Sequence, residues 1–220
     1  MRASRRLPLE ALEPYLLDVP HPGFLPPDSP LLLPAPALAW QQIFSNAHPV
    51  EIEVGFGKGM FLASSASARP DTNFLGIEIE RKYVLLTATR VAHRQLANVK
   101  LACTDARWFL RERVAEASVA ALHVYFPDPW WKNRHRKRKL LNRDFAVQCA
   151  RVLQPGGRLL FSTDVADYFA ETLEMLKEVP ALAALEPASA AEALTNFERK
   201  YREEGRPIYR AWHEKTAVPR

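Results

Sequence analysis

Hydrophobic and polar positions change their spacing repeatedly along the chain, and these changes predict alternating strands and helices. Short runs of apolar and β-branched residues predict strands over residues 50–54, 73–77, 99–102, 119–126 and 158–163. Apolar residues spaced three and four apart predict helices over 37–44, 58–67, 81–96, from 106 onward, and over 142–153 and 165–177. The chain therefore reads as a succession of strand and helix units.

This alternation predicts an α/β fold with a doubly wound, mostly parallel sheet. Parallel neighbours need a crossover between strands, and the crossover helices cover both faces of the sheet. Residues 208–218 differ from the other predicted strands, because apolar and polar residues partly alternate there. We expect this last segment to form an antiparallel strand at or near the edge of the sheet.

The first 50 residues contain ten of the 18 prolines and show no regular period before about residue 35. Such composition is typical of extended chain. We therefore expect residues 1–35 to form a Pro-rich, flexible N-terminal arm and residues 36–220 to form one domain, since 220 residues suffice for one sizeable core.

Charge and cysteine content narrow the functional classes. The net charge of +5 and a pI near 9.3 favour a polyanionic partner. The two cysteines, Cys103 and Cys149, have no metal-ligand spacing, so we expect neither a disulfide framework nor a bound metal. The N-terminus lacks an apolar signal region, and no apolar run is long enough to span a bilayer. We expect a cytoplasmic protein, as a monomer or homodimer, with no membrane partner.

A glycine-rich turn follows the first predicted strand of the domain. In the run from Glu53 to Gly59, Gly55 and Gly57 let the backbone bend sharply and approach a ligand. Glu78 ends the second strand, where a carboxylate can bind both hydroxyls of a ribose, and Asp105 follows the third strand near an adenine amino group. Helix capping is an alternative role for either acid.

The form of this turn favours S-adenosylmethionine over other nucleotides. A nicotinamide enzyme carries G-x-G-x-x-G, whereas here the third glycine is Gly59 and the next residue is Met60. A Walker A loop needs a Ser or Thr after its lysine, and Lys58 is followed by glycine. Glu53 supports the same choice, because it can bind the ammonium group of an amino-acid-bearing cofactor.

The end of the fourth strand carries the candidate reactive group. Asp128 stands between Pro127 and Pro129, which restrict the backbone and present the carboxylate at a fixed place. Ligands of open α/β sheets bind beside such strand ends. Asp128 is therefore the candidate catalytic residue and also a candidate cofactor contact, although Asp-Pro is common turn chemistry as well.

A basic segment follows immediately, and its side chains suit the phosphates of RNA. Trp130 and Trp131 offer faces for base stacking. A solvated charge run is the plain alternative, but the run adjoins the inferred reaction site. The candidate RNA contacts are Arg134, Arg136, Lys137, Arg138 and Lys139.

The segment from Phe126 to Lys139 resembles the bacterial tRNA (guanine-N7-)-methyltransferase family, whose motif reads FPDPW-x-K-x-R-H-x-K-R. Further blocks agree, namely EVGFG at 53–57, LGIE at 75–78, Asp105-Ala106, Thr163-Asp164, and TNFE at 195–198 followed by Gly205 and Ile208. The resemblance implies a Rossmann-like fold, S-adenosylmethionine as cofactor, and methyl transfer to N7 of the guanine at position 46 in the tRNA variable loop.

The resemblance also implies roles for individual residues. Glu53, Glu78, Asp105 and Asp128 would line the cofactor site, with Asp128 also catalytic. Substrate binding would fall to Lys132, Asp164, Thr195, Asn196, Phe197 and Glu198. The alternatives are methylation of another RNA base, an NAD(P)-dependent oxidoreductase with an incidental basic loop, and an RNA-binding protein on an inactive methyltransferase scaffold.

Overall fold

The computed structural model describes residues 7–26, 28–33, 35–129, 139–186 and 204–217. Within these residues the chain forms an eight-stranded sheet in the order β1-β4-β3-β2-β5-β6-β8-β7. The strands are β1 (Leu16–Leu17), β2 (Val50–Val54), β3 (Asn73–Glu78), β4 (Val99–Cys103), β5 (Val119–Tyr125), β6 (Leu153–Thr163), β7 (Leu182–Leu185) and β8 (Tyr209–Lys215). All pairs from β1 to β6 are parallel, whereas β8 pairs antiparallel with both β6 and β7.

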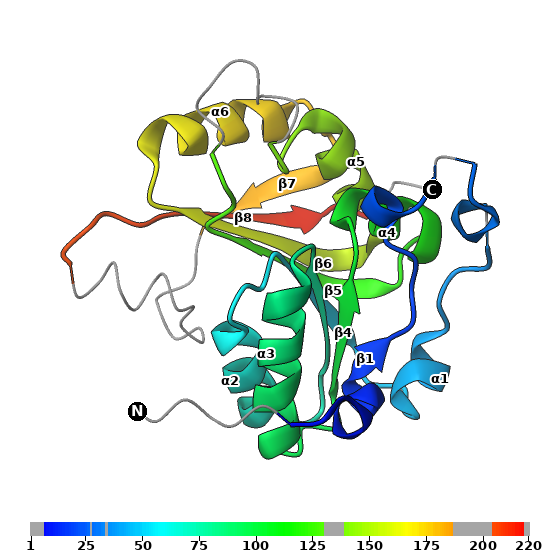
Figure 1. Cartoon of the computed structure of the whole chain (residues 1–220). Helices are drawn as coiled ribbons and strands as arrows, with labels where there is room; N and C mark the ends of the chain where they lie inside the picture. The colour runs from blue at the N-terminus through cyan, green and yellow to red at the C-terminus, as the bar shows by residue number, and fades with distance from the viewer. Residues whose placement is uncertain (1–6, 27, 34, 130–138, 187–203, 218–220) are drawn as a thin grey trace.

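Helices cover both faces of the sheet, which confirms the predicted doubly wound α/β fold (Figure 1). Helices α2 and α3 lie against β3 and β4 on one face, and α4, α5 and α6 pack together over the other. The helices are α1 (Trp40–Phe44), α2 (Met60–Ala68), α3 (Arg81–His93), α4 (Ala106–Arg113), α5 (Arg143–Val152) and α6 (Ala166–Lys177). Short 3-10 turns lie at Leu9–Ala11, Glu13–Tyr15, Pro22–Phe24 and Pro30–Leu32.

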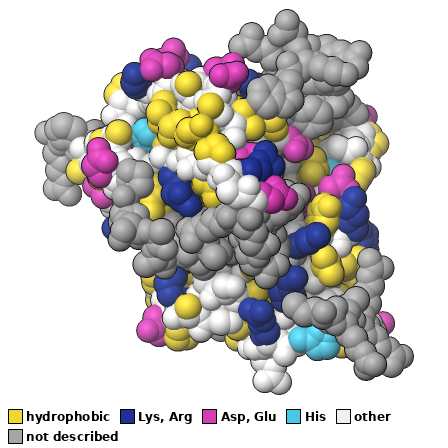
Figure 2. All heavy atoms as spheres, turned by 90° about the vertical axis from the view of Figure 1, so that its left-hand side faces the viewer, with side chains coloured by type: hydrophobic (Ala, Val, Ile, Leu, Met, Phe, Trp, Pro, Cys, Tyr) yellow, Lys and Arg dark blue, Asp and Glu magenta, His cyan; other side chains and the backbone are white. Residues whose placement is uncertain are grey.

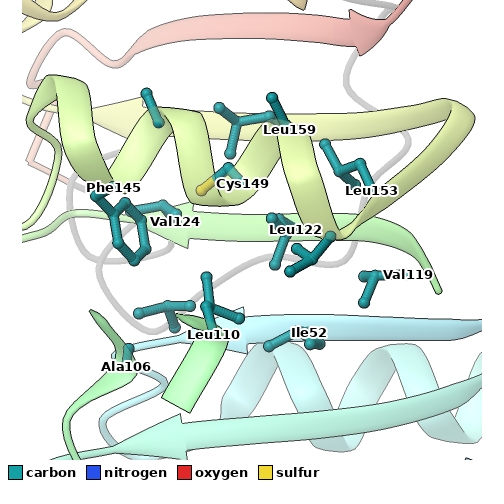
Figure 3. Packing of buried hydrophobic residues seen from close by; sticks show 14 of the residues in the cluster. Ile52, Ala106, Leu110, Val119, Leu122, Val124, Phe145, Cys149, Leu153 and Leu159 are labelled. Atoms are coloured by element: carbon teal, nitrogen blue, oxygen red, sulfur yellow. The ribbon is translucent and has the colours of Figure 1, made fainter. Parts of the chain in front are cut away.

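The main hydrophobic core lies between the sheet and the α4–α6 layer. Ile52, Leu122 and Leu159 come from three neighbouring strands and are fully buried. Figure 3 shows them beside Leu110 of α4 and Phe145 of α5. Burying each such side chain stabilises the fold by about 1.5–3 kcal/mol. Alternate residues of β2 thus enter this core, and the residues between them, Glu51 and Glu53, face the α2 side.

Part of the segment assigned to the N-terminal arm contacts the edge of the sheet. Leu16 and Leu17 pair in parallel with Leu101 and Ala102 of β4. The Lys100 ammonium donates to the Pro14 carbonyl at 2.6 Å, and the Thr104 hydroxyl donates to the Pro20 carbonyl at 2.7 Å. The chain from β1 to Pro20 therefore runs along β4 towards its carboxyl end.

The structure differs from the sequence-based elements at β6 and at the far edge. Strand β6 begins at Leu153, five residues before the predicted start, because the Pro-Gly-Gly segment forms an irregularity within the strand. Gly156 has φ +77°, and a Cβ on Gly157 would lie 2.8 Å from the Gln154 carbonyl oxygen. The predicted antiparallel C-terminal strand is present as β8, but the short β7 forms the edge beyond it.

Candidate active site

The candidate site residues follow neighbouring strands at one end of the sheet. Asp105 comes after β4, Glu78 ends β3, Gly55 follows β2, Asp128 lies beyond β5, and Asp164 follows β6. These five strands are adjacent and parallel, so their carboxyl ends meet at the same edge. The parallel order of the strands therefore brings to one rim residues that are up to 109 positions apart in the sequence.

The glycine turn needs glycine for two different reasons. Gly55, Gly57 and Gly59 have φ values of +73°, +51° and +62°, a backbone region that residues with a Cβ rarely adopt. A Cβ on Gly55 or Gly57 would meet nothing within 4 Å, so this part of the turn borders open space. A Cβ on Gly59 would instead lie 2.2 Å from Thr87 of α3. The first two glycines thus leave room for a ligand, and the third allows close packing.

Glu78 holds this turn in place. It is buried, with 8% of its surface exposed. Its Oε2 accepts from the Gly57 backbone N–H at 2.9 Å, and its Oε1 accepts from the backbone N–H groups of Ile79 and Glu80 at 2.8 and 3.1 Å. Because a carboxylate oxygen can accept more than one hydrogen bond, Glu78 retains capacity for a ligand hydroxyl.

Glu53 carries the most perturbed carboxyl group of the rim. It is 4% exposed, and burial raises its pKa to about 8. A hydrogen bond from the Leu62 backbone, at the start of α2, acts in the opposite direction, and the nearby charge of Glu78 raises the pKa further. The Oε2 atom is buried without a hydrogen-bond partner. Such an atom is costly to bury, and a cationic ligand would satisfy it.

Asp105 caps α4, as the alternative interpretation of this residue predicted. Its Oδ1 accepts from the Arg107 backbone N–H at 2.8 Å, and its Oδ2 lies 2.8 Å from the Arg107 guanidinium. Burial raises the pKa of Asp105, but the hydrogen bonds and charge of Arg107 outweigh it and hold the pKa below its ordinary value. The carboxylate is therefore ionised and fixed at the rim.

A strained residue precedes Asp128. Phe126, directly after β5, has φ +50°, which is unfavourable for a bulky side chain and is typical of functional sites. Its backbone N–H donates to the Ser162 carbonyl of β6 at 2.8 Å, which holds the turn against the neighbouring strand. Asp128 itself is exposed. Burial raises the pKa of Tyr168 in α6 to about 12, and the charges of Glu171 and Asp128 act in the same direction. Asp128 therefore lies near α6.

Two of the predicted substrate and RNA residues have protein partners in the structure. Asp164 forms an ion pair with Arg206, a residue that the sequence analysis did not single out. Lys139 pairs with Glu171 of α6, and its ammonium lies 5.1 Å from the Tyr168 ring centroid. The other predicted contacts lie outside the described residues: Lys132, Arg134, Arg136, Lys137, Arg138, Thr195, Asn196, Phe197 and Glu198.

Sequence reasoning also missed a partly buried polar chain on the α2 face of the sheet. Glu51 accepts from Arg69 at 2.6 Å and lies 2.9 Å from the His123 Nε2, and the His123 Nδ1 lies 2.9 Å from the Tyr125 hydroxyl. The alternation of residues along two strands could have revealed this chain. Glu51 and Glu53 share one face of β2, and His123 and Tyr125 share the same face of β5. Polar residues at every second position of a buried strand indicate a buried polar network.

Three further findings concern the surface, the helices and metal binding. On the face shown in Figure 2, the Lys and Arg side chains that are described lie interspersed with Asp and Glu, and hydrophobic side chains gather in its upper part. In the part of the chain that the structure covers, no helix is both long and apolar enough to cross a membrane. The same residues contain no group of three or more His, Cys, Asp or Glu arranged to hold a metal ion.

Comparison with known proteins identifies relatives over most of the chain. Residues 47–211 match the model of a putative methyltransferase family. A tRNA (guanine-N(7)-)-methyltransferase of Rhodopirellula baltica is 43% identical over 189 residues, which are 80% of this chain and 70% of the relative. The enzyme of the same name from Geobacter metallireducens is 36% identical over 208 residues, which are 92% of this chain and 97% of the relative.

Solved structures show the same fold at low sequence identity. The 16S rRNA methyltransferase KamB matches with a TM-score of 0.59 and 17% identity, over 81% of this chain and 93% of its own. A SAM-dependent O-methyltransferase from Thermotoga maritima matches with a TM-score of 0.53 and 16% identity, over 84% and 68% of the two chains. This chain thus has the fold of Rossmann-like methyltransferases. By sequence it belongs to the tRNA (guanine-N(7)-)-methyltransferase family.

Proposed function

We propose that this protein transfers the methyl group of S-adenosylmethionine to N7 of a guanine in tRNA, at position 46 of the variable loop. The observation that carries the cofactor assignment is the buried, unpartnered Oε2 of Glu53 beside the open glycine turn. The names of the related enzymes support the choice of tRNA and of guanine N7.

The residues at the rim fit S-adenosylmethionine. Glu53 would bind the ammonium group of its methionine part, and Glu78 would accept from the ribose hydroxyls while keeping its bond to Gly57. Asp105 would bind the adenine amino group with the lone pairs that Arg107 leaves free. The backbone at Gly55 and Gly57 would approach the cofactor closely, since neither position carries a Cβ. The cofactor supplies an electrophilic methyl group on a sulfonium.

Alignment supplies most of the rate in this proposal. Guanine N7 has an in-plane lone pair and no proton, so attack on the methyl group needs no general base. The purine becomes positively charged as the methyl carbon leaves sulfur, and a nearby carboxylate stabilises that charge. Asp128 would take this role at a position fixed by its two flanking prolines, with Asp164 and Glu198 accepting from guanine N1–H and N2–H.

The remaining predicted residues would hold the RNA. Lys132 and the segment Thr195, Asn196, Phe197 and Glu198 would contact the substrate nucleotide, and Arg134, Arg136, Lys137, Arg138 and Lys139 would contact phosphates. Replacing Arg134, Arg136 and Arg138 together by Ala is expected to weaken tRNA binding and to reduce the slope of log affinity against log salt by about three. Filter binding at several salt concentrations measures both quantities. An unchanged slope would exclude these arginines as phosphate contacts.

The decisive experiment is radiolabelled methyl transfer to unmodified tRNA, followed by nucleoside analysis. We expect 7-methylguanosine at position 46. Another methylated nucleoside would leave the methyltransferase assignment intact and change the substrate. In a separate calorimetric test, binding of NADH in place of S-adenosylhomocysteine would overturn both the cofactor and the activity.

The role of Asp128 is tested by Asp128→Asn. We expect S-adenosylhomocysteine affinity within about threefold of the wild type and a loss of turnover of about 100-fold, since one preorganised charge is removed. Asp144→Asn, an exposed acid in the first turn of α5, is the matched control and should retain full activity. Undiminished methyl transfer by the Asp128 variant would refute the assigned role.

A further inference from the structure

His123 lies opposite Glu53 in the sheet but is hydrogen-bonded elsewhere. The two residues are Cα partners in the parallel pair of β5 and β2, and both are buried, with 4% exposed. Their side chains leave the same face of the sheet from adjacent positions. An imidazole beside a carboxyl group with an unpartnered oxygen would ordinarily pair with it. In this structure Glu53 Oε2 remains without a partner.

Both ring nitrogens of His123 are engaged by other residues. Nε2 lies 2.9 Å from Glu51 Oε2, and because a carboxylate only accepts, Nε2 carries the proton and donates. Nδ1 lies 2.9 Å from the Tyr125 hydroxyl, which donates to it when the ring is neutral. The imidazole therefore has no nitrogen left for Glu53.

Arg69 and Phe61 hold this arrangement in place. Burial raises the pKa of Glu51, but hydrogen bonds and charges from His123 and Arg69 outweigh it and lower the pKa to about 2. Two guanidinium nitrogens of Arg69 lie 2.6 and 2.9 Å from the two oxygens of Glu51, a bidentate geometry that fixes the carboxylate. The Phe61 ring of α2 packs against His123 at 4.6 Å and Tyr125 at 5.0 Å between centroids.

We propose that Glu51, supported by Arg69 and Tyr125, is a positioning residue that keeps His123 from pairing with Glu53, so that Glu53 stays available to the ammonium group of the cofactor. A Glu53 carboxylate engaged by His123 would have to give up that hydrogen bond before it could bind a cation, and affinity would fall accordingly. This inference rests on the proposed function, in which Glu53 binds S-adenosylmethionine.

The first test is titration calorimetry of S-adenosylhomocysteine binding to Glu51→Ala. Removing the acceptor frees His123 Nε2 to pair with Glu53, and we expect the Kd to rise about tenfold. Glu112→Ala is the matched control, because Glu112 also pairs with an arginine, at 2.6 Å, but lies in α4 against the other face of the sheet. The control should bind with wild-type affinity.

The second test separates competition by His123 from a general loss of structure. The double variant Glu51→Ala with His123→Phe removes the competing imidazole and keeps an aromatic ring beside Phe61. We expect its Kd to return to within about threefold of the wild type. A merely structural role for Glu51 would leave the double variant at least as weak as the single one, which would overturn the inference.

Tyr125→Phe provides a route that leaves Glu51 intact if Glu51→Ala does not fold, as judged by thermal unfolding followed by circular dichroism. Loss of the Nδ1 partner should raise the Kd about fivefold, and adding His123→Phe should return it to within about 1.5-fold of the wild type. A folded Glu51→Ala protein with wild-type affinity would overturn the inference, as would a Tyr125→Phe variant that His123→Phe does not restore. If the wild-type protein itself did not bind S-adenosylhomocysteine, the proposed function would fail first.

Discussion

Two glutamates of the same strand, Glu51 and Glu53, occupy opposite electrostatic surroundings. Both face the α2 side of β2, and both are largely removed from water. Glu51 has a guanidinium and an imidazole as partners, and its pKa is lowered to about 2 despite burial. Glu53 has one backbone N–H and a neighbouring acid, and burial raises its pKa to about 8.

The difference shows that burial alone does not decide what a carboxyl group does. A buried acid with complete partners is a structural anion, whereas one with an unpartnered oxygen is a candidate ligand-binding group. The cationic end of the proposed cofactor would do for Glu53 what Arg69 does for Glu51. The comparison can be tested by changing each acid or the pH.

Glu53→Gln should produce the largest effect on ligand binding. The amide keeps the shape of the side chain but removes the charge that would pair with the ammonium group. We expect the Kd for S-adenosylhomocysteine to rise about 100-fold, the size of a lost charge-assisted hydrogen bond in a buried site. Titration calorimetry measures it, with Glu112→Gln on α4 as the control. A change below threefold would show that Glu53 does not bind the ammonium group.

The affinity of the wild-type protein should also depend on pH. Glu53, with a pKa of about 8, is mostly protonated at pH 6 and must release its proton to pair with a cation. Raising the pH from 6 to 7.5 should therefore lower the Kd roughly twentyfold, since each unit below the pKa costs up to tenfold. Among the described residues, this face of the sheet also carries Glu78 of β3, Glu51 of β2 with its partner Arg69, and His123 and Tyr125 of β5.

Calorimetry in two buffers of different ionisation enthalpy counts the proton that the protein releases when the ligand binds at pH 7. Glu53→Gln should abolish both this release and the pH dependence of the Kd. Equal heats in the two buffers would contradict the assignment of this proton to Glu53.

Replacing Glu51 should also lower the free energy of unfolding, and this is the smallest of the effects expected from the comparison. Because its folded pKa lies below the ordinary 4.5, its contribution to the free energy of unfolding is complete above about pH 4.5 and is lost as the pH falls towards 2. Glu51→Gln is expected to lower that free energy by about 1.5 kcal/mol at pH 7, with the difference shrinking in acid. Urea unfolding at pH 7 and pH 3 checks this. A difference that does not shrink at pH 3 would exclude the charge of Glu51 as its cause.

Much of the fold was predictable because it depends on local patterns. The strand at Val50–Val54 was predicted with the observed bounds, since alternate apolar residues mark the core face and the glycine turn marks the end. Helix capping was the alternative role that the sequence offered for Asp105, and it depends only on the residue type and the helix that follows. By contrast, β7 has only four residues, and only its pairing with β8 defines it as a strand.

By itself, the sequence determined the succession of strands and helices from β2 to α6, the glycine turn and the family, because these depend on patterns of residues close together in the chain. Only the tertiary structure decided which partners each acid receives. Glu51 and His123 are 72 residues apart, and nothing in the spacing shows that His123 pairs with Glu51 and not with Glu53. Pairing between strands sets that choice, because a hydrogen bond depends on distance and direction in space, which the parallel register of β2 and β5 provides.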